Sequence, residues 1–251
     1  MLFNIPGTNE VTCSLGDQLA FNALQTANKT SFPDPVVTHA ANLRQWWLLG
    51  SLTSEIWYLS GAVPFPFEEW PNVFVPYGCA APYSLGRTDS NLLWLSRNKD
   101  GEAIVVISKG YGVEAITTRA LEYRFTNFPT VQDAVGYTYQ QGGHTFYVIH
   151  FPTADESWAY DLATKQWHQR ISIDNNGKFH REKVAFHAFV SDENGYPDTN
   201  VGQYWATGQL YAMDQKVFTD VGFPVPYVRS FPHITDGLKE LTLGAFVADM
   251  A

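Results

Sequence analysis

The chain is poor in cysteine and in charge, and each shortage excludes a class of protein. Its two cysteines, Cys13 and Cys79, are too few for a disulfide framework and stand in no metal-ligand pair. We therefore expect two free thiols in a chain that folds in a reducing compartment. Only 16% of the 251 residues are charged, and 16 Lys plus Arg stand against 25 Asp plus Glu, a net charge of −9. No basic run exists, which argues against a surface that binds nucleic acid by neutralising phosphates.

Signals for secretion, membranes and common enzyme chemistries are also missing. The first residues, MLFNIPGTNE, hold no basic region followed by an apolar run, so we expect no signal peptide. No stretch approaches the roughly 18 apolar residues of a membrane helix, so we expect a soluble chain with no membrane partner. Nucleophile-elbow, phosphate-loop and dinucleotide patterns are absent. The sequence thus favours a protein that is not an enzyme and carries no cofactor.

Aromatic residues and turn formers are what the chain has in quantity. It holds 17 Phe, 8 Trp and 13 Tyr together with 19 Gly and 14 Pro, and 45% of it is hydrophobic. Short apolar runs bounded by turns recur along the chain, and long helical periodicity does not. This composition predicts an all-β protein. Its length fits one large all-β domain, so we interpret residues 1–251 as a single domain.

The pattern of residues 142–170 predicts most of one antiparallel β-meander. Strands are expected at 144–151, 157–160 and 166–171, with polar turns between them. Such a meander cannot bury both of its faces alone, so it needs neighbours of the same kind. A β-propeller of antiparallel four-stranded blades is the first candidate. Tyr160 and Trp167 would lie in the outer hairpin of a blade, with an aromatic packed between adjacent blades.

Similar hairpins precede and follow this meander. The firmest pairs 91–96 with 103–108, and a second pairs 134–139 with 145–151. Gly101 and Gly143, in the two turns, are 42 residues apart, close to the ~40–45 residues of a propeller blade. We predict about four blade-like units, three of them sheets over 91–118, 134–171 and 184–218. One short helix is expected, at 119–125 or at 131–135.

Both ends of the chain read as strands. Residues 2–5 are strand-like, and the apolar pattern at 241–247 has almost no polar tail after it. The last strand of a propeller must close on the first, or its edges stay open. The sequence is therefore compatible with a piece of a longer protein, in which this chain holds an incomplete propeller.

An ordered series of motifs between 50 and 170 resembles a known family. The motifs are EIWY at 55–58, GCAAP at 78–82, WL at 94–95, GY at 110–111, TTRALE at 117–122, GH at 143–144 and WAYD at 158–161. Their order resembles the packaged-DNA stabilization proteins, or tail hub proteins, of short-tailed phages, whose members are considerably longer than this chain. The resemblance implies a β-propeller component of the phage tail, between the portal assembly and the tail tip. Portal or adaptor proteins and other tail proteins would be its partners, in a homo-hexameric ring.

That resemblance also implies a function and a location. The chain would be a structural virion protein, made in the host cytoplasm, which stabilises packaged DNA and forms part of the DNA exit conduit. The excess of acid has two interpretations, ordinary solubility or a bore that lets DNA pass without tight binding. The alternative function is a carbohydrate-binding or glycan-cleaving β-propeller, because sequence alone does not exclude the two facing carboxylates of a glycosidase.

The candidate sites are few. The histidine pairs His144 with His150 and His180 with His187 have no carboxylate or cysteine at metal-ligand spacing, and a structural histidine is the favoured interpretation. The Asp-Asn-rich stretches at 174–177 and 192–195 suggest calcium loops but lack the bidentate acid of an EF-hand, so they are better explained as tight turns. No metal site is predicted.

A proline-rich segment at 63–71 is the one candidate interface. Its three prolines restrict ladder hydrogen bonds, which predicts a loop or an edge strand. It carries Phe65, Phe67 and Trp70, large aromatics that either pack under the segment or meet another subunit. The sequence leaves both possibilities open.

Overall fold

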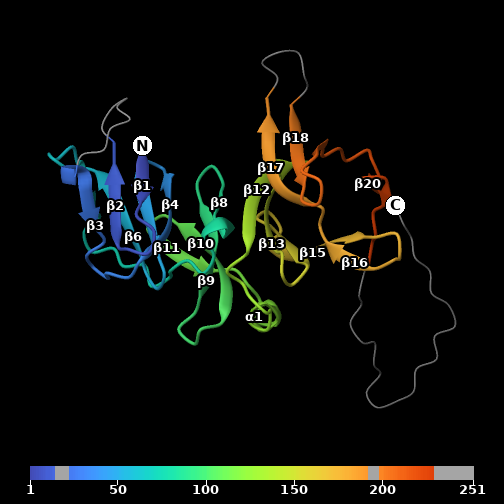
Figure 1. Ribbon diagram of the computed structural model, residues 1–251, viewed down its shortest axis with the longest axis horizontal. Coiled ribbons are helices and arrows are strands. Elements are labelled where there is room, and N and C mark those ends of the chain that lie inside the picture. Colours follow the sequence, from blue (N-terminus) through green and yellow to red (C-terminus); the bar gives the residue numbers. More distant parts are fainter. Residues whose placement is uncertain (15–22, 192–197, 229–251) are drawn as a thin grey trace.

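The computed structural model describes residues 1–14, 23–191 and 198–228, and in these ranges the protein is all-β with a single α-helix (Figure 1). Every strand pairing is antiparallel, and each sheet is a meander of strands in chain order. The first sheet holds β1 (Leu2–Asn4), β2 (Glu10–Cys13) and β3 (Thr26–Asn28). The second sheet holds β4 (Val36–Asn42), β5 (Gln45–Gly50), β6 (Ser54–Leu59) and β7 (Phe67–Glu69).

Four further sheets follow along the chain. The third holds β8 (Gly86–Arg87), β9 (Leu92–Arg97), β10 (Ala103–Lys109) and β11 (Gly112–Ala115). The fourth holds β12 (Val135–Gln141), β13 (His144–Phe151), β14 (Glu156–Asp161), β15 (Gln166–Ile173) and β16 (Phe179–Arg181). The fifth holds β17 (Val184–Val190), β18 (Thr199–Tyr204) and β19 (Leu210–Ala212). A two-stranded sheet of β20 (Thr219–Asp220) and β21 (Phe223–Pro224) comes last.

The predicted hairpins are confirmed. β9 pairs with β10 from Arg97 opposite Ala103 to Leu93 opposite Ile107, and β12 pairs with β13 along its whole length. The fourth sheet spans the predicted 134–171 and gains β16 as a fifth strand. The predicted all-β fold of antiparallel sheets is confirmed. The sheets differ in size, with four strands in the second and third, three in the first and fifth, and five in the fourth.

Two boundary predictions are wrong, each for a local reason. β11 ends at Ala115, because Thr118 already caps the following helix by accepting the N–H of Leu121 at 3.4 Å. The fifth sheet ends at Ala212 instead of reaching 218, because Asp214 begins a turn in which its carboxylate accepts the N–H of Lys216.

The predicted helix lies at the first of its two candidate positions. It is α1 (Arg119–Thr126), and residues 131–135 form no helix. Two 3-10 turns, η1 (Ala23–Gln25) and η2 (Pro82–Ser84), complete the described elements. No helix in the described ranges is long and apolar enough to cross a membrane. The apolar pattern at 241–247 lies outside the described residues.

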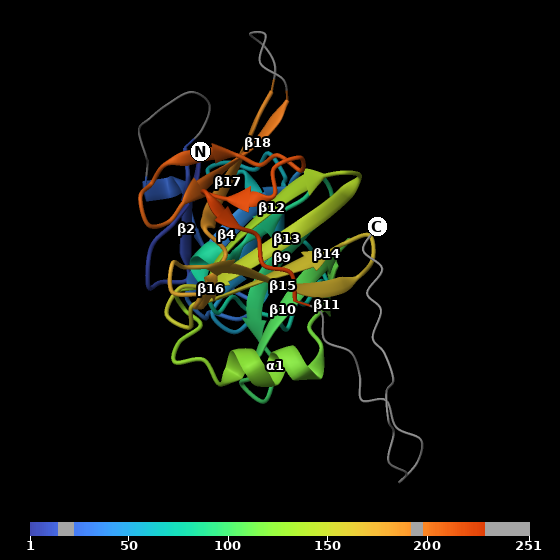
Figure 2. The same cartoon turned by 90° about the vertical axis from the view of Figure 1, so that its right-hand side faces the viewer.

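Neighbouring sheets pack face to face in chain order, as blades do, and Figures 1 and 2 show them following one another from the N-terminal to the C-terminal side. The middle sheets are buried on both faces because another sheet packs on each side. Successive residues of a strand point to opposite faces and so join different clusters. Leu92 and Trp94 join the cluster toward the second sheet, while Leu93 and Leu95 join the cluster toward the fourth. This explains why β9 and β10 read as continuous apolar runs and not as alternating ones.

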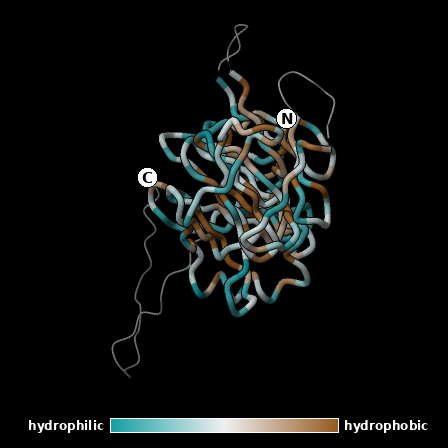
Figure 3. Tube along the Cα trace, turned by 90° about the vertical axis from the view of Figure 1, so that its left-hand side faces the viewer, coloured by the Kyte–Doolittle hydropathy of each residue, from teal (hydrophilic) through white to brown (hydrophobic). Residues whose placement is uncertain are grey.

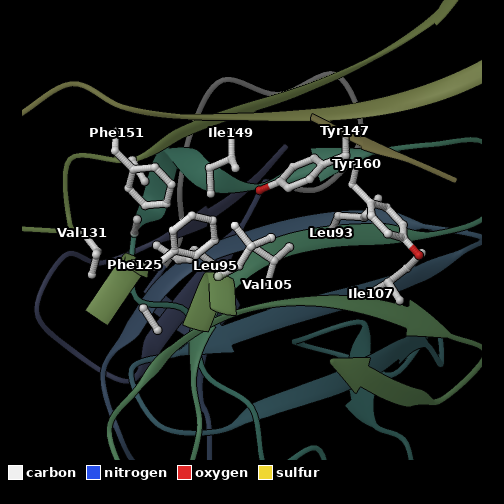
Figure 4. Close-up of a cluster of buried hydrophobic side chains, with 14 residues drawn as sticks. Leu93, Leu95, Val105, Ile107, Phe125, Val131, Tyr147, Ile149, Phe151 and Tyr160 are labelled. Atoms are coloured by element: carbon white, nitrogen blue, oxygen red, sulfur yellow. The ribbon is translucent and has the colours of Figure 1, made fainter. Parts of the chain in front are cut away.

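The largest cluster lies between the third and fourth sheets (Figure 4). Leu95 and Val105 come from the third sheet, and Ile149 and Phe151 come from the fourth. Phe125 of α1 closes one end, with its ring 4.7 Å from that of Phe151. In Figure 3 hydrophobic stretches of the trace cross the middle of the view.

Aromatic packing between blades is confirmed at the fourth sheet. Tyr160 is buried, and Trp158 and Trp167 are half-buried against the same cluster. Trp167 also donates its indole N–H to the carbonyl of Ile116, which follows β11, at 2.8 Å. Its ring therefore contacts the third sheet from the fourth. Both cysteines are free, as predicted. Both are also buried, and burial raises the pKa of the Cys79 thiol to about 11.

Candidate functional site

The proline-rich segment 63–71 forms an edge, as its prolines predict. β7 pairs with β6 on one side only, with Leu59 opposite Phe67 and Trp57 opposite Glu69. Before β7 the chain turns back on itself, and Ser60 donates its N–H to the carbonyl of Pro66 at 2.8 Å. We call Leu59, Val63, Phe65, Phe67 and Trp70 together the β7 margin.

The three aromatics of the β7 margin contact the core of the chain itself. Phe65 and Phe67 pack, half-buried, on the cluster of the first and second sheets, where the Phe67 ring lies 5.1 Å from that of Trp46. Trp70 stacks on Tyr111 of the β10–β11 turn at 4.9 Å and so joins the second and third sheets. Intrachain packing thus explains part of their surface. Their contact with another subunit stays a prediction.

Exposed apolar side chains lie beside them. Val63 is 92% exposed and Leu59 is 64% exposed. Nearby, the rings of Phe32 and Phe74 pair at 4.8 Å, although both side chains are exposed. Exposed hydrophobic groups gathered at one edge are a common mark of a protein-binding surface.

The predicted histidine pairs do not converge on a metal. His144 contacts the Asp161 carboxylate at 2.7 Å, and His187 contacts the side-chain oxygen of Asn200 at 2.8 Å. His180 lies between the carboxylates of Asp155 and Asp174, at 2.7 and 3.4 Å. Among the described residues, no group of three or more potential ligands could hold a metal ion.

The first of the two calcium-like stretches is a tight turn. A carboxylate oxygen of Asp174 accepts the N–H of Asn176 at 2.9 Å and that of Lys178 at 2.8 Å. This carboxylate therefore stabilises the turn itself. The second stretch, 192–195, lies outside the described residues.

Basic side chains near helix α1 are engaged by glutamates. Arg124 binds Glu156 through two hydrogen bonds of 2.7 and 2.8 Å, and Arg119 binds Glu102 and Glu122, each at 2.8 Å. These pairs leave little positive charge free on that face.

A cavity that the sequence does not reveal lies where the fourth and fifth sheets meet. Its volume is about 240 Å³, and its walls come from the ends of β12 and β13, from the end of β16 and the start of β17, and from the end of β18 with the β18–β19 turn. It is lined by Val135, His150, Pro152, Arg181, Ala185, Phe186, Gln203, Tyr204, Trp205 and Gly208. Segments this far apart in the chain carry no local pattern that announces a shared cavity.

His150 and Ser157 form a buried pair beside this cavity. The His150 Nδ1 atom lies 2.6 Å from the Ser157 hydroxyl, which also accepts the N–H of Glu182 at 3.1 Å. Burial, helped by the nearby charge of Arg181, lowers the pKa of His150 to about 3, so the ring is neutral at physiological pH. Ser157 is fully buried, which withholds its hydroxyl from any substrate and disfavours a nucleophile role.

Comparison with known proteins gives one strong match. The family profile described as "Bacteriophage P22 Gp10, beta-propeller" matches residues 3–188. None of the curated proteins compared with the chain matches it.

Several solved structures are similar at low identity. TolB from Acinetobacter baumannii is 12% identical with a TM-score of 0.37, over 82% of this chain and 48% of that one. The extracellular domain of the one-component system BT4673 from B. thetaiotaomicron is 13% identical with a TM-score of 0.34, over 82% of this chain and 25% of that one. A chain of the S. cerevisiae complex of Dbp5 with Nup159, Gle1, IP6 and ADP is 9% identical with a TM-score of 0.36, over 81% of this chain and 62% of that one. The chain thus spans less than two thirds of each, and at these TM-scores the likeness carries no argument.

Proposed function

The chain belongs to the phage-stabilisation family of Bacteriophage P22 Gp10, a family of β-propeller structural proteins of the phage particle, and on that premise we propose that it is a tail hub. In this role it lies below the portal, stabilises packaged DNA and forms part of the conduit through which the DNA leaves. The family match over residues 3–188 is the observation that carries the proposal.

The charge of the chain supports a conduit through which DNA slides. A wall that holds DNA and later lets it pass works best without phosphate contacts, because each contact adds salt-sensitive affinity. The net charge is −9, and ion pairs to glutamates hold Arg119 and Arg124. We propose that the bore is neutral or repulsive toward DNA and that a ring of six copies forms it.

The β7 margin is the surface that we propose for contact with a neighbouring subunit or with a portal or adaptor protein. Phe65, Phe67 and Trp70 are held by the core, so they offer a rigid apolar base. The exposed side chains of Leu59 and Val63 lie beside this base and have no such anchor. Rigid aromatics with an exposed apolar rim are the composition expected at the centre of an interface.

The test is complementation of a phage mutant that lacks the protein. We expect particles that fill with DNA and then lose it, measured as DNase-sensitive DNA, and rescue by the unaltered chain. Val63→Asp should fold with an unchanged melting temperature and yet fail to enter particles. Leu43→Asp is the matched control, because Leu43 is also exposed, at 61%, but lies in the β4–β5 turn. DNA retention without the protein would refute the hub role, and normal assembly of Val63→Asp would refute the β7 margin.

The carbohydrate alternative has one observation in its favour. An open depression of about 460 Å³ beside α1 is lined by Tyr123, Trp158, Asn127 and the Arg124–Glu156 pair, among others. Aromatic faces beside polar groups suit a sugar ring, although Arg124 and Glu156 already bind each other. A glycan array read against Trp158→Ala separates the two functions, since a tail hub needs no glycan for assembly.

A further inference from the structure

Buried polar atoms without partners gather at the junction of the fourth and fifth sheets. Tyr137 Oη, His150 Nε2 and Glu182 Oε2 are all buried, and none has a hydrogen-bond partner. The Tyr137 ring stacks on His150 at 5.5 Å, and the Ser157 hydroxyl that contacts His150 also accepts the backbone N–H of Glu182. Folded proteins leave few such atoms unpaired, so each needs an explanation, and of the three residues His150 lines the cavity.

Arg181, in the wall of that cavity, has a charge that no carboxylate neutralises directly. Its guanidinium lies 4.5 Å from the centre of the Trp205 ring, and no ion pair within the described ranges reaches it. The nearest acids are Asp155 and Asp133, and the second carboxylate oxygen of Asp133 is buried without a hydrogen-bond partner. Asp155 binds His180 and the N–H of Arg181 itself, and Asp133 accepts the N–H of Thr153.

The contact with Trp205 engages one face of the guanidinium and leaves its edge for other partners. The edge carries the N–H donors, in the planar fork that matches a carboxylate with two parallel hydrogen bonds. An arginine held in this way, partly buried and next to a cavity, is arranged to receive an oxyanion.

His150 supplies a second donor. The Ser157 oxygen already accepts the N–H of Glu182, and His150 Nδ1 is the acceptor within reach of the Ser157 hydroxyl proton. The ring is neutral, so when Nδ1 accepts, the remaining proton is on Nε2. The unpartnered Nε2 atom is then an N–H donor on a residue that lines the cavity.

The rest of the wall is apolar. Val135, Pro152, Ala185 and Phe186 line the cavity, and the Trp205 ring lies beside Arg181 in its wall. A volume of about 240 Å³ is below the range of drug-sized sites and suits a molecule with one small ring. The wall therefore combines a cation and a neutral donor with a surface for a flat hydrophobic body.

We propose that this cavity binds a small organic anion, a carboxylate on a flat apolar body. The carboxylate receives the edge N–H groups of Arg181, the ring lies against the apolar wall, and a small rearrangement brings His150 Nε2–H to the bound oxygen or to a water beside it. The site is separate from the β7 margin and does not depend on the proposed hub function.

Benzoate is the probe, tested on the full chain by saturation-transfer NMR and by quenching of tryptophan fluorescence. A ligand of this size is expected to bind in the millimolar range. Benzamide, which has the same shape without the charge, should bind at least about tenfold more weakly, because hydrogen bonds to a charged group are the strong ones. Inorganic phosphate alone should compete poorly, since it lacks the apolar body.

Arg181→Gln should weaken benzoate binding about tenfold or more. The matched control is Arg124→Gln, which also removes an arginine next to a tryptophan, 5.7 Å from the Trp158 ring, at the other depression. This control should keep the affinity of the unaltered chain. A thermal melt shows whether each variant folds. If Arg181→Gln does not fold, the comparison of benzoate with benzamide on the unaltered chain still tests the proposal.

Four outcomes would overturn the site. They are no binding of benzoate at tens of millimolar, equal binding of benzoate and benzamide, phosphate competing as well as benzoate, and equal loss in the Arg124→Gln variant. The last outcome would place the ligand at the α1 depression. A cavity that holds only ordered water would give the first outcome.

Discussion

The buried ion pair of Lys29 and Asp34 gives the sharpest test of how the first two sheets are joined. The Lys29 side chain is completely enclosed, and its Nζ atom donates to the Phe32 carbonyl and to the Thr53 hydroxyl, each at 2.6 Å, as well as to Asp34. Lys29 follows β3, and Thr53 lies in the turn between β5 and β6. The pair therefore fastens one sheet to the next.

The two partners should respond unequally to truncation. Asp34→Ala leaves a buried ammonium with neutral acceptors only, and breaking a buried pair in this way costs about 3–5 kcal/mol of unfolding free energy. Lys29→Met should cost less, because the Asp34 carboxylate keeps the N–H of Leu52 at 2.7 Å and that of Thr53 at 3.3 Å. The double variant should cost clearly less than the two single costs added together.

Urea denaturation followed by tryptophan fluorescence measures these differences as shifts of the midpoint at constant slope. The control is Glu114→Ala, which breaks a pair with Lys109 in which both side chains are more than half exposed. We expect that variant to keep the midpoint of the unaltered chain. An Asp34→Ala midpoint equal to that of the control, or a larger loss in Lys29→Met than in Asp34→Ala, would refute the reasoning.

The same pair predicts a dependence on pH. Burial acts to raise the pKa of Asp34, but the hydrogen bonds from Lys29 and Leu52 outweigh it and hold that pKa below its usual value. The contribution of Asp34 is therefore complete above its unfolded pKa of about 3.9 and is lost as the pH falls through the lower folded value. Burial raises the pKa of neighbouring Glu55, which has the opposite effect. The difference in stability between the unaltered chain and Asp34→Asn isolates the Asp34 term and should shrink in acid.

Three further predictions test packing and charge. Trp167→Ala should lower the unfolding free energy by about 3–5 kcal/mol, and a thermal melt unchanged by it would remove its role between the sheets. Gly136→Ala should destabilise the chain in the same melt, because a Cβ there would overlap the carbonyl oxygen of Ser84, whereas Gly112→Ala, with ordinary contacts only, should not. Free duplex DNA should bind weakly or undetectably at physiological salt in an anisotropy assay, and tight binding that is lost steeply as salt rises would contradict the proposed bore.

Sequence reasoning succeeded where the signal is local. The hairpin of β9 and β10 is marked by a turn around Gly101, whose φ of +83° explains the glycine, and by the two apolar runs that flank it. The fourth sheet is a meander whose short turns leave few other pairings. Helix α1 is announced by Thr118, a good N-cap residue, at its start.

The second sheet was not predicted as a sheet, although its motif 55–58 contributed to the family resemblance. The run of β5, QWWLLG, is continuously apolar because both of its faces are covered, and such a run does not distinguish a strand from a buried helix. β7 is short and surrounded by prolines. The cavity at Arg181 could not be predicted from the sequence. Its walls come from four separate segments, which meet only because whole sheets pack together.

The two ends of the row of sheets differ from its middle in one physical respect. The second, third and fourth sheets each have neighbours on both faces, whereas one face of the fifth sheet is uncovered within the described residues. The register places Phe186, Val190 and Leu210 on that face, and they are 53%, 46% and 69% exposed. In a closed propeller such a face would pack on the next blade. Because burial on two faces protects backbone amides from local opening, hydrogen exchange should be slowest in β9, β10 and β13 and much faster in β17 and β18. Equal protection along the row would mean that something else covers the fifth sheet in solution.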